Sequence, residues 1–360
     1  MQLHRAFAAL ACLALGCGGR YGGTARAPTP AAKAPAGGLA AAALPYAIVD
    51  ARTGRAVDES AFWARVGSAR AVCVGEDHTN PHHHWVQLSV VQHLVKHLPK
   101  GTRIALGMEM FQRPFQGVLE DYASKRIDAA ALRSRAGWEE RWGYDWGFYA
   151  ETIDAAVAAG AHLLALNASR ELTKKVVRKG LESLTPEEKA QVPELVLDDQ
   201  GHRAWFDALM DSMGGTDAHS TKAPDVPDDD VHKDVKPAPA PPPAAEMPSA
   251  ERIYTVQVIW DESMADGAAK WLAATPSGHA VILAGNGHCH DTAIVNRLKR
   301  RGITDVISVR PVVDVDGQVA ESLAKPMNDF IVVLTMPPDA KAAAEAPAAE
   351  APAADSTHAP

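Results

Sequence analysis

Two Gly-x-x-His elements lie roughly two hundred residues apart in this chain, and each follows a short hydrophobic run. The first runs from Gly75 to His78 after the sequence Ala-Val-Cys-Val, and the second runs from Gly285 to His288 after Val-Ile-Leu-Ala. A run rich in β-branched residues that closes on glycine and a polar cluster is typical of a core strand. In an open α/β sheet, the carboxyl edge of such strands is where ligands bind.

Two further hydrophobic runs end in the same way. Residues 103–108 end on Glu109, and residues 162–166 end on Asn167. If all four runs are neighbouring parallel strands, the polar residues that follow them meet at one edge of the sheet. The alternative is that each polar residue only terminates its own strand. The shared crevice would contain five side chains: Glu76, His78, Glu109, Asn167 and His288.

Imidazole and carboxylate groups are the natural ligands of divalent transition metals, and imidazole also ligates haem iron. Glu76, His78 and His288 are therefore candidate metal ligands. The chain contains no His-Glu-x-x-His and no Cys-x-x-Cys element, so its spacing is not diagnostic of zinc.

A hydrolase is a second chemical interpretation of the same residues. Glu76 or Glu109 could act as a general base towards a water molecule held by His78 and His288. No Gly-x-Ser-x-Gly element is present, which argues against a serine nucleophile of the α/β-hydrolase kind.

The elements between the candidate strands are predicted to be helices. Asn80-Pro81 is a helix start, and apolar spacing predicts helices over 82–98, 115–131, 138–159 and 251–274. Besides the run at 281–284, strands are expected at 305–309 and 331–334. Alternating strands and helices predict an α/β fold with a mostly parallel sheet flanked by helices. Residues 171–213 are expected to form a smaller helical subdomain.

The two ends of the chain indicate an exported and anchored protein. Residues 1–17 have the features of a bacterial lipoprotein signal peptide, and Cys17 would be the lipidated residue. Gly18 after it favours the outer membrane. Residues 18–45 are expected to be a disordered tether, and the folded domain is expected over 46–336. Disorder is also predicted for two other segments, the insertion 214–248 and the tail 337–360.

The formal net charge of −8 argues against nucleic acid as a partner. Beyond the signal, no apolar run is long enough to span a bilayer. Cys73 and Cys289 are the cysteines of the expected domain. Two buried thiols are the favoured interpretation, and a disulfide in an oxidising compartment is the alternative.

The residues from Gly75 to Pro81, with His83-His84 and Gln87, resemble the opening motif of the ChaN-like haem-binding lipoproteins. That family belongs to the Tiki/TraB superfamily together with the erythromycin esterases. The chain departs from the pattern at Thr79, where Asp is common, and at 293–295, where Gly-Val-Pro is usual. Five later segments resemble the remaining motifs: Gly107 to Phe111; Trp142 to Asp145 with Tyr149; Asn167 with Arg170; Gln257 with Trp260-Asp261 and Met264-Ala265; and Ala284 to His288.

The resemblance implies a haem-binding surface lipoprotein of the outer membrane, facing the periplasm or the cell exterior, that takes part in haem or iron uptake. Its partners would be haem or an iron complex, the membrane through the lipid anchor, and an outer-membrane receptor. A metal-dependent or His/Glu-based protease or esterase remains the alternative, as does a scaffold whose site has decayed. The residues implied in cofactor binding are His78, His83, His84, Asn167, Arg170 and His288, and the family's tyrosine ligand could be Tyr122, Tyr144, Tyr149 or Tyr254.

Overall fold

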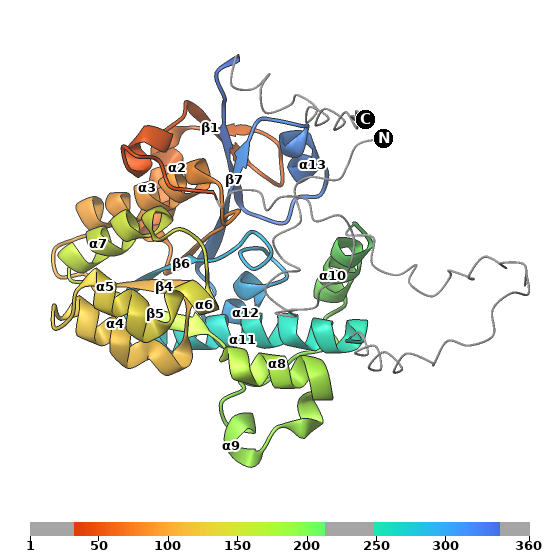
Figure 1. The fold of residues 1–360 in the computed structure, drawn as a ribbon. Helices are drawn as coiled ribbons and strands as arrows, with labels where there is room; N and C mark the ends of the chain where they lie inside the picture. Colours follow the sequence, from red (N-terminus) through yellow and green to blue (C-terminus); the bar gives the residue numbers. More distant parts are fainter. Residues whose placement is uncertain (1–31, 213–247, 339–360) are drawn as a thin grey trace, which may run out of the picture.

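The computed structural model describes residues 32–212 and 248–338. Within them the chain forms an eight-stranded sheet with helices on both faces, which confirms the predicted α/β fold (Figure 1). The expected signal peptide with Cys17, the first part of the tether, and nearly all of the insertion and the tail lie outside these residues.

The sheet has the strand order β2-β1-β8-β7-β3-β6-β4-β5. Every neighbouring pair from β8 to β5 is parallel, whereas β1 pairs antiparallel with β8 and β2. The four runs that the sequence analysis singled out are the adjacent strands β3, β6, β4 and β5. The strands are β1 (Tyr46–Asp50), β2 (Ala56–Val57), β3 (Ala71–Val74), β4 (Ile104–Gln112), β5 (His162–Asn167), β6 (His279–Leu283), β7 (Val306–Val313) and β8 (Phe330–Leu334).

Helices cover the two faces of the sheet in separate layers. Successive strand residues point to opposite faces, so Val72 and Val74 pack into one core and Ala71 and Cys73 into the other. The first core is covered by α2, α3, α4, α5, α6 and α7, and the second by α11 and α12. These helices are α2 (Glu59–Ser68), α3 (Pro81–His97), α4 (Gln116–Ala123), α5 (Ala129–Ala136), α6 (Trp138–Arg141), α7 (Ala150–Ala158), α11 (Ala250–Ala274) and α12 (Ile294–Arg300).

Helix α3 begins where the sequence predicted. The Asn80 side chain accepts a hydrogen bond from the backbone N–H of His82 at 3.0 Å, and Pro81 occupies the first turn. This cap fixes the direction in which the chain leaves β3, and it therefore positions the residues between Gly75 and Asn80.

The stretch 171–212, for which the sequence predicts a helical subdomain, is helical in the structure. It contains α8 (Arg170–Lys179), α9 (Pro186–Lys189) and α10 (Gln200–Ser212). Leu172 and Val176 of α8 pack against Val256 and Ile259 of α11, and Phe206 of α10 packs against the same long helix. In Figure 1, α8 and α9 lie below α11, away from the sheet.

The prediction of a disordered tether over residues 18–45 is wrong for the last residues of this segment. A short 3₁₀ helix, η1 (Leu39–Ala42), packs on α3, and the Leu39 side chain is 0% exposed. The backbone N–H of Leu39 donates to Glu151 Oε1 at 2.8 Å, and the ring of His82 bonds the carbonyl of Ala42 at 2.7 Å. Low-complexity composition predicted disorder here, but one leucine and two backbone hydrogen bonds are enough to hold this segment on the domain.

Cys73 and Cys289 form a disulfide, so the favoured expectation of two free thiols is wrong. Cys73 lies in β3 opposite Ile282 of the neighbouring strand β6, and Cys289 follows shortly after that strand. Parallel pairing of β3 with β6 brings the two Cα atoms to 5.3 Å, within the range that a disulfide spans.

The last described elements are α13 (Gln318–Ala324) and β8.

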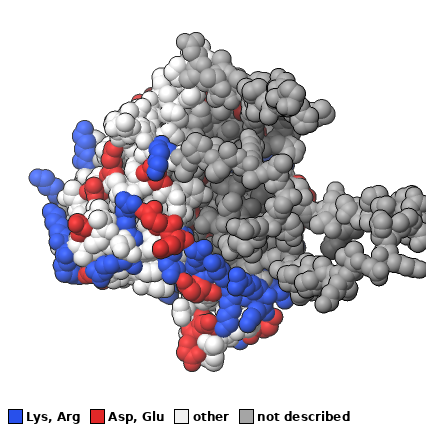
Figure 2. Space-filling view, viewed as in Figure 1, with Lys and Arg blue, Asp and Glu red and all other residues white. Residues whose placement is uncertain are grey.

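Figure 2 shows Lys and Arg interspersed with Asp and Glu on one face, and basic side chains gather at its lower end, where Figure 1 places α8. No helix in the described ranges is both long and apolar enough to cross a bilayer.

Candidate functional site

Three adjacent strands deliver the candidate residues to one edge of the sheet. Val74 of β3 and Met108 of β4 both pair with Leu283 of β6, so the segments that follow leave the sheet side by side. Glu109 follows Met108 directly, and both Gly-x-x-His elements begin at this level. The predicted meeting of Glu76, His78, Glu109 and His288 is therefore present, but as a buried cluster rather than an open crevice.

The two glycines of the Gly-x-x-His elements allow the two loops to touch. A Cβ atom on Gly75 would lie 2.2 Å from Asn286 Oδ1, and one on Gly285 would lie 3.1 Å from His78 Cε1. The backbone N–H of Asn286 also donates to the Glu76 carbonyl at 2.8 Å. Glycine is needed at both positions because a side chain would separate the loops.

Glu76 is the centre of the first half of the cluster. Its Oε1 atom lies 2.7 Å from His78 Nδ1 and accepts a hydrogen bond from the Tyr149 hydroxyl at 2.8 Å. Its Oε2 atom lies 3.4 Å from His84 Nδ1. Burial alone raises the pKa of Glu76, but His84, His78 and the Tyr149 hydroxyl outweigh it and lower the pKa to about 2. Glu76 is thus a buried carboxylate that is ionised at neutral pH.

His78 contacts two aromatic rings of the segment 142–144. Its ring lies 4.7 Å from that of Trp142 and 4.8 Å from that of Tyr144. Burial lowers the pKa of His78, but the hydrogen bond and charge of Glu76 outweigh this and raise it. Tyr144 is half-buried, whereas His78 and Trp142 are buried.

Glu109 links the two halves. Its Oε2 atom accepts a hydrogen bond from the backbone N–H of Gly285 at 2.7 Å, and its Oε1 atom lies 3.4 Å from His288 Nε2. Burial raises the pKa of Glu109, but the positive charges of His288 and His78 and the Gly285 N–H lower it overall. One carboxylate therefore interacts with the histidines of both elements.

His288 is held between two carboxylates. Its Nδ1 atom lies 2.6 Å from Asp261 Oδ1, opposite the contact with Glu109. Burial lowers the pKa of His288, but the charges of Glu109 and Asp261 raise it to about 10. His288 is therefore a buried cation at neutral pH, whose Nδ1–H donates to Asp261 and whose Nε2 faces Glu109 at 3.4 Å.

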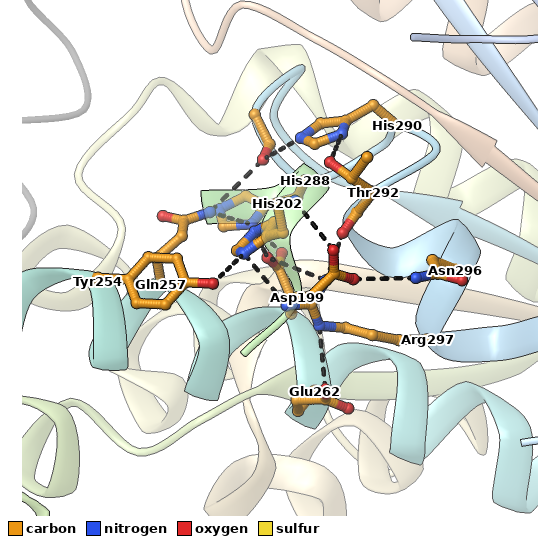
Figure 3. Close-up of polar contacts among 12 residues, drawn as sticks. Asp199, His202, Tyr254, Gln257, Glu262, His288, His290, Thr292, Asn296 and Arg297 are labelled. Carbon is orange, nitrogen blue, oxygen red and sulfur yellow. Dashed lines mark hydrogen bonds and ion pairs between the residues drawn. The ribbon is translucent and has the colours of Figure 1, made fainter. Parts of the chain in front are cut away.

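A second layer of polar groups, which includes His202, Glu262 and Arg297, lies beside His288 (Figure 3). Asp261 Oδ2 lies 3.0 Å from His202 Nε2 and 3.9 Å from the Arg297 guanidinium. The charges of Arg297 and His288, together with the contact with His202, lower the pKa of Asp261 despite its burial. The guanidinium of Arg297 also pairs with the buried Glu262 at 3.2 Å. Sequence reasoning missed His202 and Arg297, because both lie in helices where a buried polar residue has no local signal.

His83 and His84 lie in the interior rather than at the edge of the site. His83 Nδ1 accepts a hydrogen bond from the backbone N–H of Asp77 at 2.9 Å, and burial lowers the pKa of His83 to about 4. The ring of His84 stacks on Phe148 at 4.8 Å. Both rings support the loop that carries His78. Because both rings are buried among protein groups, their positions do not match the prediction that they contact a cofactor directly.

Asn167 and Arg170 lie one strand further along the same edge. Asn167 pairs with Gln112 at the end of β5, and the backbone N–H of Arg170 donates to Gln112 Oε1 at 3.0 Å. Arg141 donates to the same oxygen at 2.9 Å. The Arg141 and Arg170 side chains remain partly exposed here and form a basic border to the site.

The expectation that Glu76, His78 and His288 share a metal ion does not fit this geometry. In residues 32–212 and 248–338, no group of three or more His, Cys, Asp or Glu side chains could hold a metal ion. Glu76 and Glu109 are also poorly suited to act as general bases, because each carboxylate is already hydrogen-bonded and has a lowered pKa.

Residues 62–298, about two thirds of the chain, match the family model described as "Haem-binding uptake, Tiki superfamily, ChaN". The protein belongs to this family. A search of curated proteins gave no match.

Three solved structures are similar to this chain. The first is from the study of cofacial haem binding to ChaN of Campylobacter jejuni, with 15% identity, a TM-score of 0.58, and 80% of this chain and 96% of that chain covered. An erythromycin esterase mutant in its open conformation has 11% identity and a TM-score of 0.38, with 77% and 78% covered. The type III effector HopBA1 has 10% identity and a TM-score of 0.35, with 76% and 90% covered. The first supports the fold, whereas TM-scores as low as the other two do not establish a shared fold.

The family resemblance implies a tyrosine ligand for haem, and the four candidate tyrosines differ in burial and contacts. Tyr149 and Tyr254 are each 1% exposed, and their hydroxyls face Glu76 and His202 respectively. Tyr122 bonds Asp154 at 2.5 Å, between α4 and α7. Tyr144 is the candidate that is half-buried and contacts the cluster. A phenol, aromatic rings and a basic border form a donor set suited to the iron, the ring and the carboxylates of haem.

Proposed function

We propose that this protein binds haem at the carboxyl edge of its sheet, with the Tyr144 phenol as the iron ligand. The ring contact of 4.8 Å between Tyr144 and His78 is the observation that supports this assignment. It joins a half-buried tyrosine to the motif that resembles the family's opening element.

The contacts of His78 with Glu76 support this role for Tyr144. Glu76 holds the His78 ring by its Nδ1 atom and raises its pKa, which favours the protonated form. A protonated imidazole beside a phenol stabilises the phenolate, and the phenolate is the form that ligates ferric iron.

The basic border supplies partners for the two carboxylates of haem. The Arg141 side chain and the backbone N–H of Arg170 both donate to Gln112 Oε1, and Arg141 also pairs with Glu171 at 2.8 Å. Arg141 is also held over the Phe115 ring, 4.8 Å from its centroid. Guanidinium groups bind carboxylates in a bidentate manner, so this border would orient the ligand.

We further propose that the protein is an outer-membrane lipoprotein, anchored through Cys17, that takes part in haem or iron uptake. The Cys73–Cys289 disulfide supports export, because disulfides persist in oxidising compartments. Facing the periplasm or the exterior, the protein would exchange its ligand with an outer-membrane receptor. Replacing Cys17 with Ser should release the protein into the soluble periplasmic fraction, and unchanged membrane fractionation would contradict the lipid anchor.

Hemin titration of the full chain tests the haem site. The wild type should develop a saturable Soret band, and Tyr144→Phe should weaken binding by about tenfold or more, equivalent to about 1.4 kcal/mol. Tyr122→Phe is the matched control, because it removes a hydroxyl from a tyrosine outside the cluster. A Tyr144→Phe variant with the affinity and spectrum of the wild type would contradict the assignment.

A further inference from the structure

A stack of three rings lies at the carboxyl end of α3, at the opposite end of this helix from His78. His93 and His97 are one helical turn apart, with ring centroids separated by 4.4 Å and planes inclined by 26°. The Trp63 ring of α2 stacks on the other side of His93 at 4.3 Å, with an inclination of 15°.

Hydrogen bonds to Glu59 hold the Trp63 side of the stack in place. Trp63 Nε1 donates to Glu59 Oε1 at 3.0 Å, and the Tyr46 hydroxyl donates to the same oxygen. The indole is therefore fixed by a hydrogen bond as well as by packing. Imidazole lone pairs lie in the ring plane, so the His93 and His97 rings must turn out of the stack for both to reach one ion.

The stack borders a surface cavity of about 510 Å³. His93 is half-buried and His97 is exposed, so both rings can be reached from solvent. Neither ring makes a hydrogen bond with any residue in the part of the chain that the structure describes, which leaves nitrogen lone pairs for another partner. The cavity lining includes Ser60, Trp63, Gly67, His93, His97 and Pro99.

We propose that His93 and His97 chelate one divalent transition-metal ion of the zinc, nickel or copper type. Two histidines four residues apart on a helix face the same side, and this spacing is used by helical metal sites. Imidazole is a preferred ligand of these ions. The site supplies two protein ligands, and water fills the remaining coordination positions from the cavity.

This site is separate from the proposed haem site. Helix α3 has 17 residues, which corresponds to roughly 25 Å at about 1.5 Å per residue. The Tyr144 region lies at the start of the helix and the ring stack at its end. Metal binding here can therefore be measured in the absence of haem, and its failure would leave the haem proposal untouched.

The test is calorimetric titration of the full chain with Zn²⁺, compared among the wild type, His93→Gln, His97→Gln and His162→Gln. The first two variants should each lose one equivalent of zinc or weaken its binding by at least about tenfold, since even the outer-shell partners of metal ligands are worth 10–100-fold in affinity. His162 is an exposed histidine at the start of β5, and its replacement should change nothing. Thermal melts establish that each variant is folded.

Quenching of tryptophan emission by Cu²⁺ gives an independent measurement. Because Trp63 stacks on His93, copper bound there should quench part of the emission with saturation at one equivalent. That phase should be absent from His93→Gln, His97→Gln and Trp63→Phe. Zinc binding equal to the wild type in both histidine variants would overturn the site, and so would a loss in only one of them, because chelation requires both rings.

Discussion

Asp261 Oδ1 lies 2.6 Å from His288 Nδ1, and this contact joins the long helix α11 to the loop that follows β6. Both side chains are buried, and on its other side His288 faces Glu109. The pair therefore sets the charge and orientation of His288 in the second Gly-x-x-His element from the helix that precedes β6.

Replacing Asp261 with Asn should lower the pKa of His288 from its value of about 10 and destabilise the fold. Breaking a buried ion pair from one side costs about 3–5 kcal/mol, because the remaining charge is uncompensated. Imidazole titration by NMR and guanidinium unfolding at pH 7 measure the two effects. Asp207→Asn, which removes an exposed partner of Arg203, is the control and should cost less than about 1 kcal/mol.

The same pair predicts the alkaline behaviour of the wild type. The folded-state pKa of His288 is raised from 6.5 to about 10, so its contribution to stability is full below pH 6.5 and is lost as the pH rises through about 10. The free energy of unfolding should fall over this interval. In Asp261→Asn the decline should be smaller, and an equal decline in both proteins would assign it to another group.

Tyr149→Phe should destabilise the protein most clearly at neutral pH. The hydroxyl donates to the buried Glu76 carboxylate, and a hydrogen bond to a charged group contributes about 1.5–3 kcal/mol. Because the pKa of Glu76 is lowered from 4.5 to about 2, the carboxylate contributes stability above pH 4.5, and this is lost as the pH falls towards 2. Denaturation midpoints at pH 7 and pH 3 should therefore differ less in the variant than in the wild type. Equal pH dependence would mean that Tyr149 does not help to hold Glu76 ionised.

The double variant Cys73→Ala/Cys289→Ala should lose a large part of the stability. The disulfide closes a separation of 216 residues, for which loop entropy predicts roughly 5 kcal/mol, against about 2–5 kcal/mol found on removing native disulfides. Both sulfur atoms are buried, so reductant should react only when the protein unfolds. Rapid reduction under native conditions would show that the loop after β6 opens independently.

Gly75→Ala should destabilise the site by about 1–3 kcal/mol, because its Cβ would lie 2.2 Å from Asn286 Oδ1. Gly117→Ala is the matched control. Gly117 lies in α4 with no atom within 4 Å of the added Cβ, so that change should be neutral or stabilising by up to about 1 kcal/mol. The melting temperatures of the two variants are compared. A decrease only in Gly75→Ala shows that the close contact between the loops requires glycine, whereas a decrease in both shows a general sensitivity to replacing glycine.

Much of the architecture could be predicted from the sequence because its signals are local. The composition of the runs that end at Val74, Met108, Leu166 and Ala284 predicts four strands, and the structure places these strands next to one another in the sheet. The short antiparallel strands β1 and β2 were missed, since residues 46–57 have little apolar alternation.

The chemistry of the cluster depended on contacts that no local pattern contains. His202 and Arg297 reach Asp261 only because α10, α11 and α12 pack together, and His83 and His84 turn inward only because α3 packs on the sheet. The sequence alone determined the strands, the glycines and the residue types at the edge of the sheet, because hydrophobic periodicity and turn preferences act over a few residues. The tertiary structure alone decided the Cys73–Cys289 pairing and which carboxylate faces which histidine, because both depend on the close approach of segments distant in sequence, and that approach is set by the packing of the whole domain.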